Sequence, residues 1–504
     1  MQLNHWNDKK PDNIEGKKWW AMLAVAMSVF MGTIDLSIIN IALPTLVAEL
    51  QTTFPKIQWV ILGYALAVTG LLMGAARLGD MFRKKAIFGM GLIIFTLSSL
   101  LCGLSPNVEW LIGFRILQGI GAVMMQALSS AILVELFPAR ERGRAMGIIG
   151  SVVSVGVALG PALGGVIIGA IGWRWIFLVN VPVGIMTLLV LLYFVPSLPA
   201  RVANQSFDIW GAFILLLVLT CFALGMTLGQ GIGFGARPVR GLLILTGFGF
   251  ISFLLIEKRT NEPMIELELF RNNLFTLSLL MGFFSFALLG GFFLMPFYLQ
   301  VAKGYAMQQV GFMMMIVPLL MGVVASPSGW LSDQLGTRVI SLIGLLLMCA
   351  GALSISFLTM ETSVMGYLFR VAPMGIGMGI FFSPNNSAIM GSVPPQRLGV
   401  ASGLMALSRN LGTTVWMPIM SAVFTAIVFS SSSMPSSNNV IDAPAQALVK
   451  GVTGAYRVAA MILLVSTIFA FISFVAEKKK GRTEGNHGEP LSVKQNDPDS
   501  QPRY

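Results

Sequence analysis

Long apolar segments recur along the whole chain, with short polar segments between them. The first runs from Trp19 to Leu43, which is long enough to cross a bilayer as an α-helix. Similar segments follow to the end of the apolar region. The predicted spans are residues 19–43, 57–79, 86–105, 110–136, 145–170, 174–196, 208–228, 239–256, 274–299, 309–332, 338–358, 364–392, 398–428 and 455–476. The pattern therefore predicts an all-α membrane protein with 14 transmembrane helices.

One carboxylate interrupts the first apolar segment. Asp35 lies in the stretch TIDLSIINIALP, roughly 24 Å along a helix from Trp19 and so inside the hydrocarbon. A carboxylate at that depth costs at least ~2.5 kcal/mol on insertion scales, so such residues usually face the protein interior and have a function. Two interpretations stay open. Asp35 either forms a hydrogen bond to a neighbouring helix, or it exchanges a proton during transport, because burial and a nearby cation change its proton affinity in opposite directions.

Composition narrows the function classes. The 504 residues are 55% hydrophobic and only 11% charged, which excludes an ordinary soluble domain. Cys102, Cys221 and Cys349 share no pair spacing, and the two histidines, His5 and His487, lie near the ends of the chain. The sequence therefore predicts no disulfide, no metal site and no histidine relay. It also contains no phosphate-binding loop, so direct use of ATP by this chain is not expected. We expect the proton gradient to supply the energy, and we expect no cofactor.

The distribution of basic residues predicts the orientation in the membrane. Of the 33 Lys and Arg residues, 22 fall in the tails and in loops on the side of the termini, seven fall in the opposite loops, and four fall within spans. This excess predicts a multi-pass protein of the cell (plasma or inner) membrane with both termini in the cytoplasm. It also accounts for the net charge of +11, so that charge does not indicate nucleic-acid binding. The first apolar segment is too long for a signal-peptide core, so we expect it to be retained.

An internal repeat predicts two similar halves. A set of small residues and one proline recurs 256 residues later: Gly119, Gly121, Pro138, Gly143, Ala145 and Gly147 match Gly375, Gly377, Pro394, Gly399, Ala401 and Gly403. At nearly the same offset, LGD at 78–80 recurs as LSD at 331–333. Chance matches among the 54 glycines are the alternative. Parallel six-helix halves hold a substrate site near the midplane between them. The predicted organisation is an N-terminal tail (1–18), a six-helix bundle (19–200), two linker helices (201–260), a second six-helix bundle (261–476) and a C-terminal tail (477–504).

Four motifs carry a resemblance to a known family. They are IDLSIINIALP (34–44), ARLGDMFRKK (76–85) with its later copy GWLSDQLGTR (329–338), LIGFRILQGIGA (111–122) and GVALGPALGG (156–165). The stretch WRWIF (173–177) with Asn180 and Pro182, and the stretch PFYLQ (296–300), agree with them. The chain resembles the major facilitator superfamily, and within it the fourteen-helix drug:proton antiporters. The resemblance implies the major-facilitator fold, in which two six-helix bundles flank two inserted helices.

The resemblance also implies roles for particular residues. Asp35 and Arg115 match the residues implicated in proton coupling and substrate handling. The antiporter-motif helix is represented by Gly156, Gly160, Pro161, Gly164 and Gly165. Small residues four apart let helices approach closely, and the proline bends the helix, which suits halves that rock without leaking protons. Ordinary helix packing is the alternative.

A second group of matched residues suggests a cytoplasmic gate. Its members are Asp80, Arg83, Lys84, Asp333 and Arg338. Arg83 stands where the family pattern has a glycine. Charge pairs at this boundary would latch the two halves when the inward mouth is closed. The alternative is a set of weak loop salt bridges.

The candidate pocket rests on residue types that suit flat apolar cargo. Its predicted members are Arg370, Arg409, Phe292, Phe293 and Met314. Phenylalanine and methionine crowd the first two spans of the second half, and such side chains suit a promiscuous pocket for flat apolar cations. Core packing or lipid contact is the alternative for each of them.

Together these features predict a transporter and not an enzyme. We expect a proton-coupled antiporter that exports amphiphilic, cationic drugs or toxic compounds by alternating access. The first alternative is a dedicated proton-coupled transporter of one metabolite, such as an amino acid, a siderophore or a lipid-linked sugar. A passive channel or a membrane sensor is a further alternative. Expected partners are the small-molecule substrate, protons and membrane lipid. The sequence leaves open whether a periplasmic adaptor protein takes part and whether the protein is a monomer.

Overall fold

The structure is a computed structural model that describes residues 14–196, 208–260, 265–394, 397–432, 434 and 439–485. Within these ranges, the side chains of residues 14–16, 77, 80, 139, 209 and 476–485 are not described. The described residues include 14 helices that are long and apolar enough to cross a membrane. This confirms the predicted all-α fold with 14 spans.

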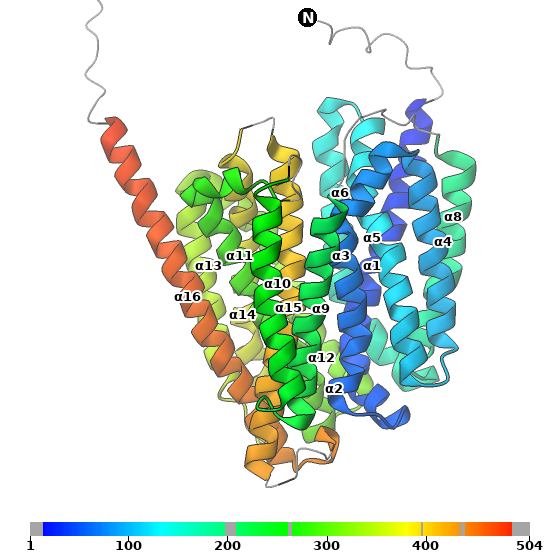
Figure 1. Cartoon of the computed structure of the whole chain (residues 1–504), viewed down its shortest axis with the longest axis vertical. Helices are drawn as coiled ribbons and strands as arrows, with labels where there is room; N and C mark the ends of the chain where they lie inside the picture. Colours follow the sequence, from blue (N-terminus) through cyan, green and yellow to red (C-terminus); the bar gives the residue numbers. More distant parts are fainter. Residues whose placement is uncertain are drawn as a thin grey trace, which may run out of the picture.

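The spans form two six-helix halves that stand side by side (Figure 1). The first half contains α1 (Ile14–Glu49), α3 (Trp59–Met81), α4 (Lys84–Gly103), α5 (Val108–Leu136), α6 (Ala139–Ile171) and α8 (Asn180–Phe194), with the short helices α2 (Phe54–Ile57) and α7 (Trp175–Leu178). The second half contains α11 (Asn273–Phe292), α12 (Met307–Leu335), α13 (Thr337–Ile355), α14 (Val364–Gly391), α15 (Leu398–Ser432) and α16 (Ala445–Gly485), with the short segments η1 (Leu267–Arg271), η2 (Phe297–Ala302) and η4 (Val440–Asp442). Both ends of the chain leave from the same face.

Two additional helices, α9 (Ile209–Ile232) and α10 (Arg237–Glu257), lie between the halves in sequence. The helix α9 contacts both of them. The side-chain oxygen of Gln230 accepts hydrogen bonds from Gln58 (3.0 Å) in the first half and from Ser421 (3.2 Å) and Thr425 (3.3 Å) in the second. The linker helix α9 is thus anchored to both halves.

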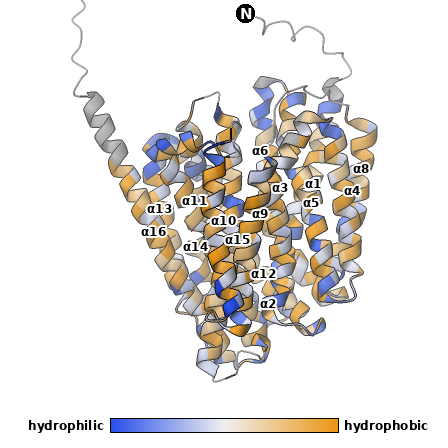
Figure 2. Ribbon diagram, in the orientation of Figure 1, coloured by the Kyte–Doolittle hydropathy of each residue, from blue (hydrophilic) through white to orange (hydrophobic). Residues whose placement is uncertain are grey.

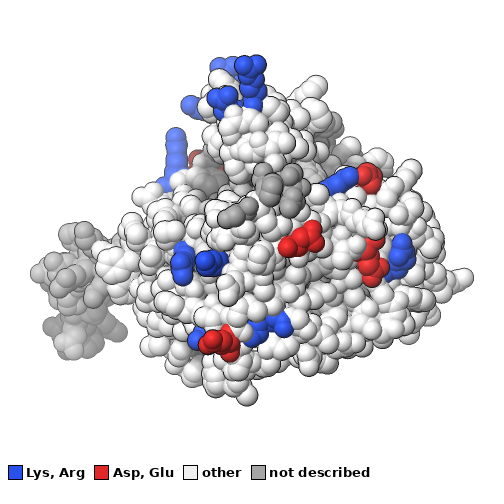
Figure 3. Space-filling model, turned by 90° about the horizontal axis from the view of Figure 1, so that it is seen from below, with Lys and Arg blue, Asp and Glu red and all other residues white. Residues whose placement is uncertain are grey.

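The outer surface of the bundle is apolar, as a lipid environment requires. Hydrophobic residues cover the sides of the molecule, and hydrophilic residues gather at its ends (Figure 2). Helix α10 illustrates this, because it exposes Phe248, Ile251 and Leu255. The face opposite the termini carries scattered side chains of both signs (Figure 3).

The sequence repeat corresponds to a repeated helix contact. A Cβ atom on Gly121 would lie 2.5 Å from the backbone nitrogen of Phe95, and one on Gly377 would lie 2.6 Å from that of Met348. Each glycine therefore lets two neighbouring helices, α4 and α5 or α13 and α14, approach to backbone contact. The glycines are 256 residues apart, so the same packing occurs once in each half.

The last span differs from its prediction. Residues 430–455 were expected to form an outer loop, but α16 begins at Ala445. The first turns of α16 pack against α15: a Cβ atom on Gly451 would lie 2.6 Å from Val428 and 2.7 Å from Phe424. At the other end the backbone stays helical to Gly485, inside the predicted tail, and residues 486–504 lie outside the described residues.

Candidate functional site

Asp35 lies inside the first half, where three side chains donate hydrogen bonds to its carboxylate. Arg115 Nη1 lies 2.5 Å from Asp35 Oδ2. The amide groups of Gln118 and Asn180 donate to Asp35 Oδ1 over 3.0 Å and 3.2 Å. These four residues, the Asp35 network, join α1, α5 and α8, and only 3% of Asp35 is exposed. The carboxylate therefore faces the protein interior and not lipid.

Arg115 is fully buried and is held on several sides. Its Nε donates to the carbonyl of Val60 at 2.9 Å, and its Nη1 also donates to the side-chain oxygen of Gln118 at 2.6 Å. The guanidinium carbon lies 4.4 Å from the ring centre of Tyr64 and 5.7 Å from that of Phe177. A buried charge is stable only with a counter-charge and hydrogen bonds. Arg115 has a counter-charge and hydrogen bonds. If Asp35 lost its charge, Arg115 would have no counter-charge in this network.

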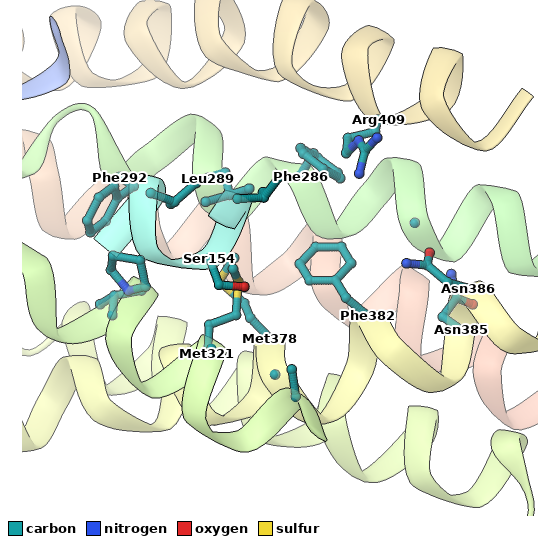
Figure 4. A pocket seen from close by; sticks show the side chains of 18 of the residues that line it. Ser154, Phe286, Leu289, Phe292, Met321, Met378, Phe382, Asn385, Asn386 and Arg409 are labelled. Carbon is teal, nitrogen blue, oxygen red and sulfur yellow. The ribbon is translucent and has the colours of Figure 1, made fainter. Parts of the chain in front are cut away.

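A large cavity separates the two halves near the middle of the bundle (Figure 4). One part has a volume of about 360 Å³ and is lined mainly by the second half. The other has a volume of about 480 Å³ and is lined mainly by the first half. Val157, Phe286 and Arg409 line both parts, so the two are continuous. A cavity of this size suits a drug-sized molecule.

The wall of the cavity is mostly apolar. Phe286, Phe292 and Phe382 lie around its second-half part together with Met321 and Met378 (Figure 4). Polar contributions come from serine, threonine and amide side chains. Among the described residues that line either part, Arg409 is the only charged one. Asp35 and Arg115 do not line the cavity, although Tyr64, whose ring covers the Arg115 guanidinium, does.

One face of the antiporter-motif helix α6 packs against α1 without room for a methyl group. The close contacts involve the glycines at four-residue spacing. A Cβ atom would lie 2.1 Å from Thr33 Oγ1 if placed on Gly156, 1.9 Å from Ser37 Oγ if placed on Gly160, and 2.9 Å from Ile41 Cγ2 if placed on Gly164. This strip therefore binds α6 to the helix that carries Asp35.

The other face of α6 meets the second half. A Cβ atom on Gly165 would lie 2.5 Å from the carbonyl oxygen of Met307, and one on Gly311 would lie 2.4 Å from the carbonyl oxygen of Pro161. This α6–α12 contact closes the cavity at the end away from the termini. Further towards the face of the termini, a Cβ atom on Gly322 of α12 would lie 3.5 Å from Ser154 of α6, and one on Gly150 would meet nothing within 4 Å.

Two of the predicted gate residues contact side chains of their own half. Lys84 contacts Glu135 at 2.6 Å within the first half, and Arg338 donates to Ser278 at 2.5 Å within the second. Asp333 is exposed and Arg338 does not pair with it. Every ion pair between two described side chains lies within one half.

The two copies of the loop motif also differ in backbone shape. Gly336 has a φ of 91°, a left-handed conformation that favours glycine, whereas Arg83 is extended with a φ of −69°. Arg83 is exposed. The side chain of Asp80 lies outside those described. The glycine-to-arginine replacement noted in the sequence therefore accompanies a different turn.

Three predicted pocket residues do not line the cavity. Arg370 donates to the carbonyl of Gly366 one turn earlier on its own helix. Phe293 is buried and its ring stacks on that of Phe54. Its neighbour Phe292 lines the cavity instead. Met314 is fully buried next to the closed α6–α12 contact, beyond the end of the cavity. These three positions correct the prediction, while Phe292 and Arg409 lie on the wall.

Sequence reasoning missed three residues around Asp35. Gln118 follows Arg115 by one helical turn within the motif LIGFRILQGIGA, so helix spacing could have placed both on one face. Asn180 stood in the recognised stretch after WRWIF, but nothing there indicated its direction. Tyr64 gave no signal, because an aromatic residue in an apolar span is ordinary.

Comparison with known proteins places this geometry in a family. The family model described as Major Facilitator Superfamily matches residues 25–417. The chain belongs to the major facilitator superfamily. The riboflavin transporter RibZ of Clostridioides difficile (strain 630) is 34% identical over 409 residues, which is 81% of this chain and 88% of that protein. The multidrug resistance protein Stp of Mycobacterium tuberculosis (strain CDC 1551 / Oshkosh) is 30% identical over 427 residues, which is 84% of this chain and 79% of that protein.

A solved structure supports the fold. A bacterial homolog of the human lysosomal transporter Spinster, in an inward-facing and unoccupied conformation, superposes with a TM-score of 0.67 at 16% identity. The match covers 92% of this chain and 97% of that one. As a major facilitator protein with 14 spans, the chain is a multi-pass membrane transporter of small molecules and not an enzyme. The sequence-based assignment to this superfamily is confirmed.

Proposed function

We propose that this protein is a proton-coupled antiporter of the cell membrane that exports amphiphilic compounds, with both termini in the cytoplasm. The observation that carries the proposal is the Asp35 network. A carboxylate with three hydrogen-bond donors, one of them a buried guanidinium at 2.5 Å, lies in the hydrocarbon region next to the cavity wall. Intramembrane carboxylates with such partners mark proton or ion pathways.

The network couples protonation to rearrangement through charge. A proton on Asp35 would neutralise the carboxylate and leave the Arg115 guanidinium buried without its counter-charge, which is costly. The network would therefore reorganise when the proton binds or leaves. Tyr64 connects it to the cavity, because its ring covers the guanidinium while its side chain lines the cavity wall. Cargo and proton thereby act on the same buried arginine.

The position of the cavity supports export from the cytoplasm. The cavity is closed at the end away from the termini, where Gly165 and Gly311 hold α6 against α12. It extends towards the face of the termini through Ser28, Leu133 and Met146. The excess of basic residues on that side supports its assignment to the cytoplasm. This arrangement is the one that would load cargo from the inside.

Proton movement in liposomes tests the coupling. Purified protein is reconstituted with a pH-sensitive dye inside, and amphiphilic fluorescent compounds are added. We expect wild type to move protons when a transported compound is added and Asp35→Asn to move none while it still folds. Asp442→Asn is the matched control, because Asp442 is exposed in η4. Asp35→Asn with undiminished proton movement, or wild type without proton movement for any compound, would refute the proposal.

A dedicated metabolite transporter is the second candidate. It is favoured by the 34% identity to a protein described as a riboflavin transporter. Riboflavin, like many drugs, is a flat aromatic compound that an aromatic cavity accommodates. A substrate profile in an efflux-deficient host distinguishes the two: transport of several unrelated amphiphiles supports the antiporter of many compounds, and transport of riboflavin alone supports the dedicated transporter.

A further inference from the structure

The cavity carries one positive charge and no negative charge on its wall. Arg409 extends from α15 to the cavity wall, where it lies beside Phe286 (Figure 4). None of the described residues that line either part of the cavity is Asp, Glu or Lys. Asp35, the acidic residue buried inside the first half, pairs with Arg115. A positively charged cargo would therefore meet a like charge in this cavity and no carboxylate.

Arg409 differs from the other arginine of the midplane in its partners. Arg115 has a carboxylate at 2.5 Å and a carbonyl at 2.9 Å. Among the described residues, none pairs with the Arg409 guanidinium, and the one side-chain hydrogen bond to this residue is donated by the hydroxyl of Thr413 to its backbone carbonyl. Arginine within a span normally pairs or faces a water-filled cavity. Arg409 faces the cavity, and its five N–H donors remain available to cargo.

A second donor lies beside it. The side-chain nitrogen of Asn410 is buried and has no hydrogen-bond partner among the described residues. Asn410 and Arg409 both line the first-half part of the cavity. Buried amide nitrogens without a partner are uncommon in native structures and need an explanation. Two adjacent unpaired donors on one wall form a site for oxygen acceptors.

Aromatic rings line the second-half part of the cavity together with Arg409. The rings of Phe286 and Phe382 are 5.6 Å apart and tilted by 57°. Phe292 continues the apolar wall along α11. Such rings stack on a flat apolar body, while the guanidinium binds a carboxylate-like group in a bidentate way. The wall thus combines a place for a flat ring system with a place for an anionic group.

We propose that the preferred cargo is a flat amphiphile with an anionic group, whose oxygens accept hydrogen bonds donated by Arg409 and Asn410 while the phenylalanines cover its ring system. The proposal rests on the proposed export function and names its substrate class. It differs from the sequence-based expectation of cationic cargo, which considered the Met and Phe content but not the charge that faces the cavity.

Equilibrium binding of two matched dyes tests the charge preference. Fluorescein and rhodamine 123 share a xanthene ring system but are anionic and cationic at neutral pH. Fluorescence anisotropy is measured with the full chain in lipid nanodiscs, without a pH gradient. We expect wild type to bind fluorescein at least about tenfold more tightly than rhodamine 123, since a hydrogen-bonded charge pair contributes roughly that much.

Three variants identify the residue responsible. Arg409→Gln should lower fluorescein affinity about tenfold or more and leave rhodamine 123 binding unchanged or tighter. Arg409→Lys keeps the charge but not the planar donor fork, so it should retain the anion preference with intermediate affinity. Arg370→Gln is the matched control, since Arg370 binds its own helix outside the cavity, and it should behave as wild type.

Several outcomes would overturn the inference. Wild type that binds rhodamine 123 as tightly as fluorescein would overturn it. An Arg409→Gln variant that matches wild type for both dyes would overturn it as well. If Arg409→Gln does not fold, an Arg409→Lys protein without anion preference overturns it equally. Because dye binding is measured without a pH gradient, its result does not depend on whether transport is coupled to protons. Proton movement driven by rhodamine 123 alone would refute this inference and leave the proposed function intact.

Discussion

The α6–α12 contact predicts a change in conformation from a single methyl group. In Gly165→Ala, the added Cβ atom would lie 2.5 Å from the carbonyl oxygen of Met307 and 3.0 Å from the Cα atom of Gly311. Ordinary contacts of a Cβ atom begin at 3.4 Å. The two backbones would have to separate by about 0.9 Å, the difference between 3.4 and 2.5 Å, because neither partner atom belongs to a flexible side chain.

The strain exists only while this end of the cavity is closed. Overpacking a tight contact costs about 1–3 kcal/mol. A cost confined to one of two states shifts their ratio by roughly 5- to 150-fold towards the other. We therefore expect Gly165→Ala to populate the state in which α6 and α12 are apart at the end away from the termini.

Electron–electron resonance between two spin labels measures this shift. Ile171 at the end of α6 is 58% exposed, and Gln309 near the start of α12 is exposed. Labels on cysteines introduced there span the contact, and the three native cysteines are buried. We expect a longer distance population in Gly165→Ala than in the parent protein.

Two other glycines of α6 provide controls. Gly150→Ala places its methyl group in open space and should leave the distances unchanged. Gly164→Ala meets the side chain of Ile41 within the first half, so it should lower thermal stability without lengthening the distance. A Gly165→Ala protein with the distance distribution of Gly150→Ala would refute the assignment of this contact as the closure.

Two further predictions concern stability. Gly121→Ala and Gly377→Ala should each lower the free energy of unfolding by about 1–3 kcal/mol, since their methyl groups would meet a neighbouring backbone in the same way in each half. Thermal unfolding in detergent checks this, with Gly113→Ala, whose methyl group lies in open space, as the control. Two variants as stable as the parent protein would contradict the prediction. Arg115→Gln should lower the free energy of unfolding by about 3–5 kcal/mol, because it leaves the Asp35 carboxylate buried without its cation. The double variant with Asp35→Asn should recover much of that loss. A loss equal to the sum of the two single variants would contradict the pairing.

The number and type of the helices followed from the sequence because membrane spans are specified locally. An apolar run of sufficient length needs no knowledge of its neighbours to be recognised. The start of α16 was predicted wrongly for the opposite reason: its first turns are recognised only from the fit of Gly451 and Gly454 against α15. Tertiary packing decided that boundary.

The candidate site was less predictable, because it depends on the rotation of each helix about its axis. The depth of Asp35 predicted that it faces inward, but not that it faces the interior of one half with Arg115 and Asn180. Phe292 and Phe293 are equivalent by composition, yet only Phe292 lines the cavity. The charge of the cavity wall, set by Arg409 alone among its described residues, appears only when all the helices are in place.

Helix α6 connects the helix that carries Asp35 with the closed end of the cavity. On one side its glycines leave no room between it and Thr33 or Ser37, which lie two residues before and after Asp35 on α1. On the other side Gly165 holds it against α12 of the second half. Close-packed helices transmit displacements because they cannot be compressed. A movement of α1 on protonation of Asp35 would thus reach the α6–α12 contact directly, which gives the glycine spacing a reason beyond close packing.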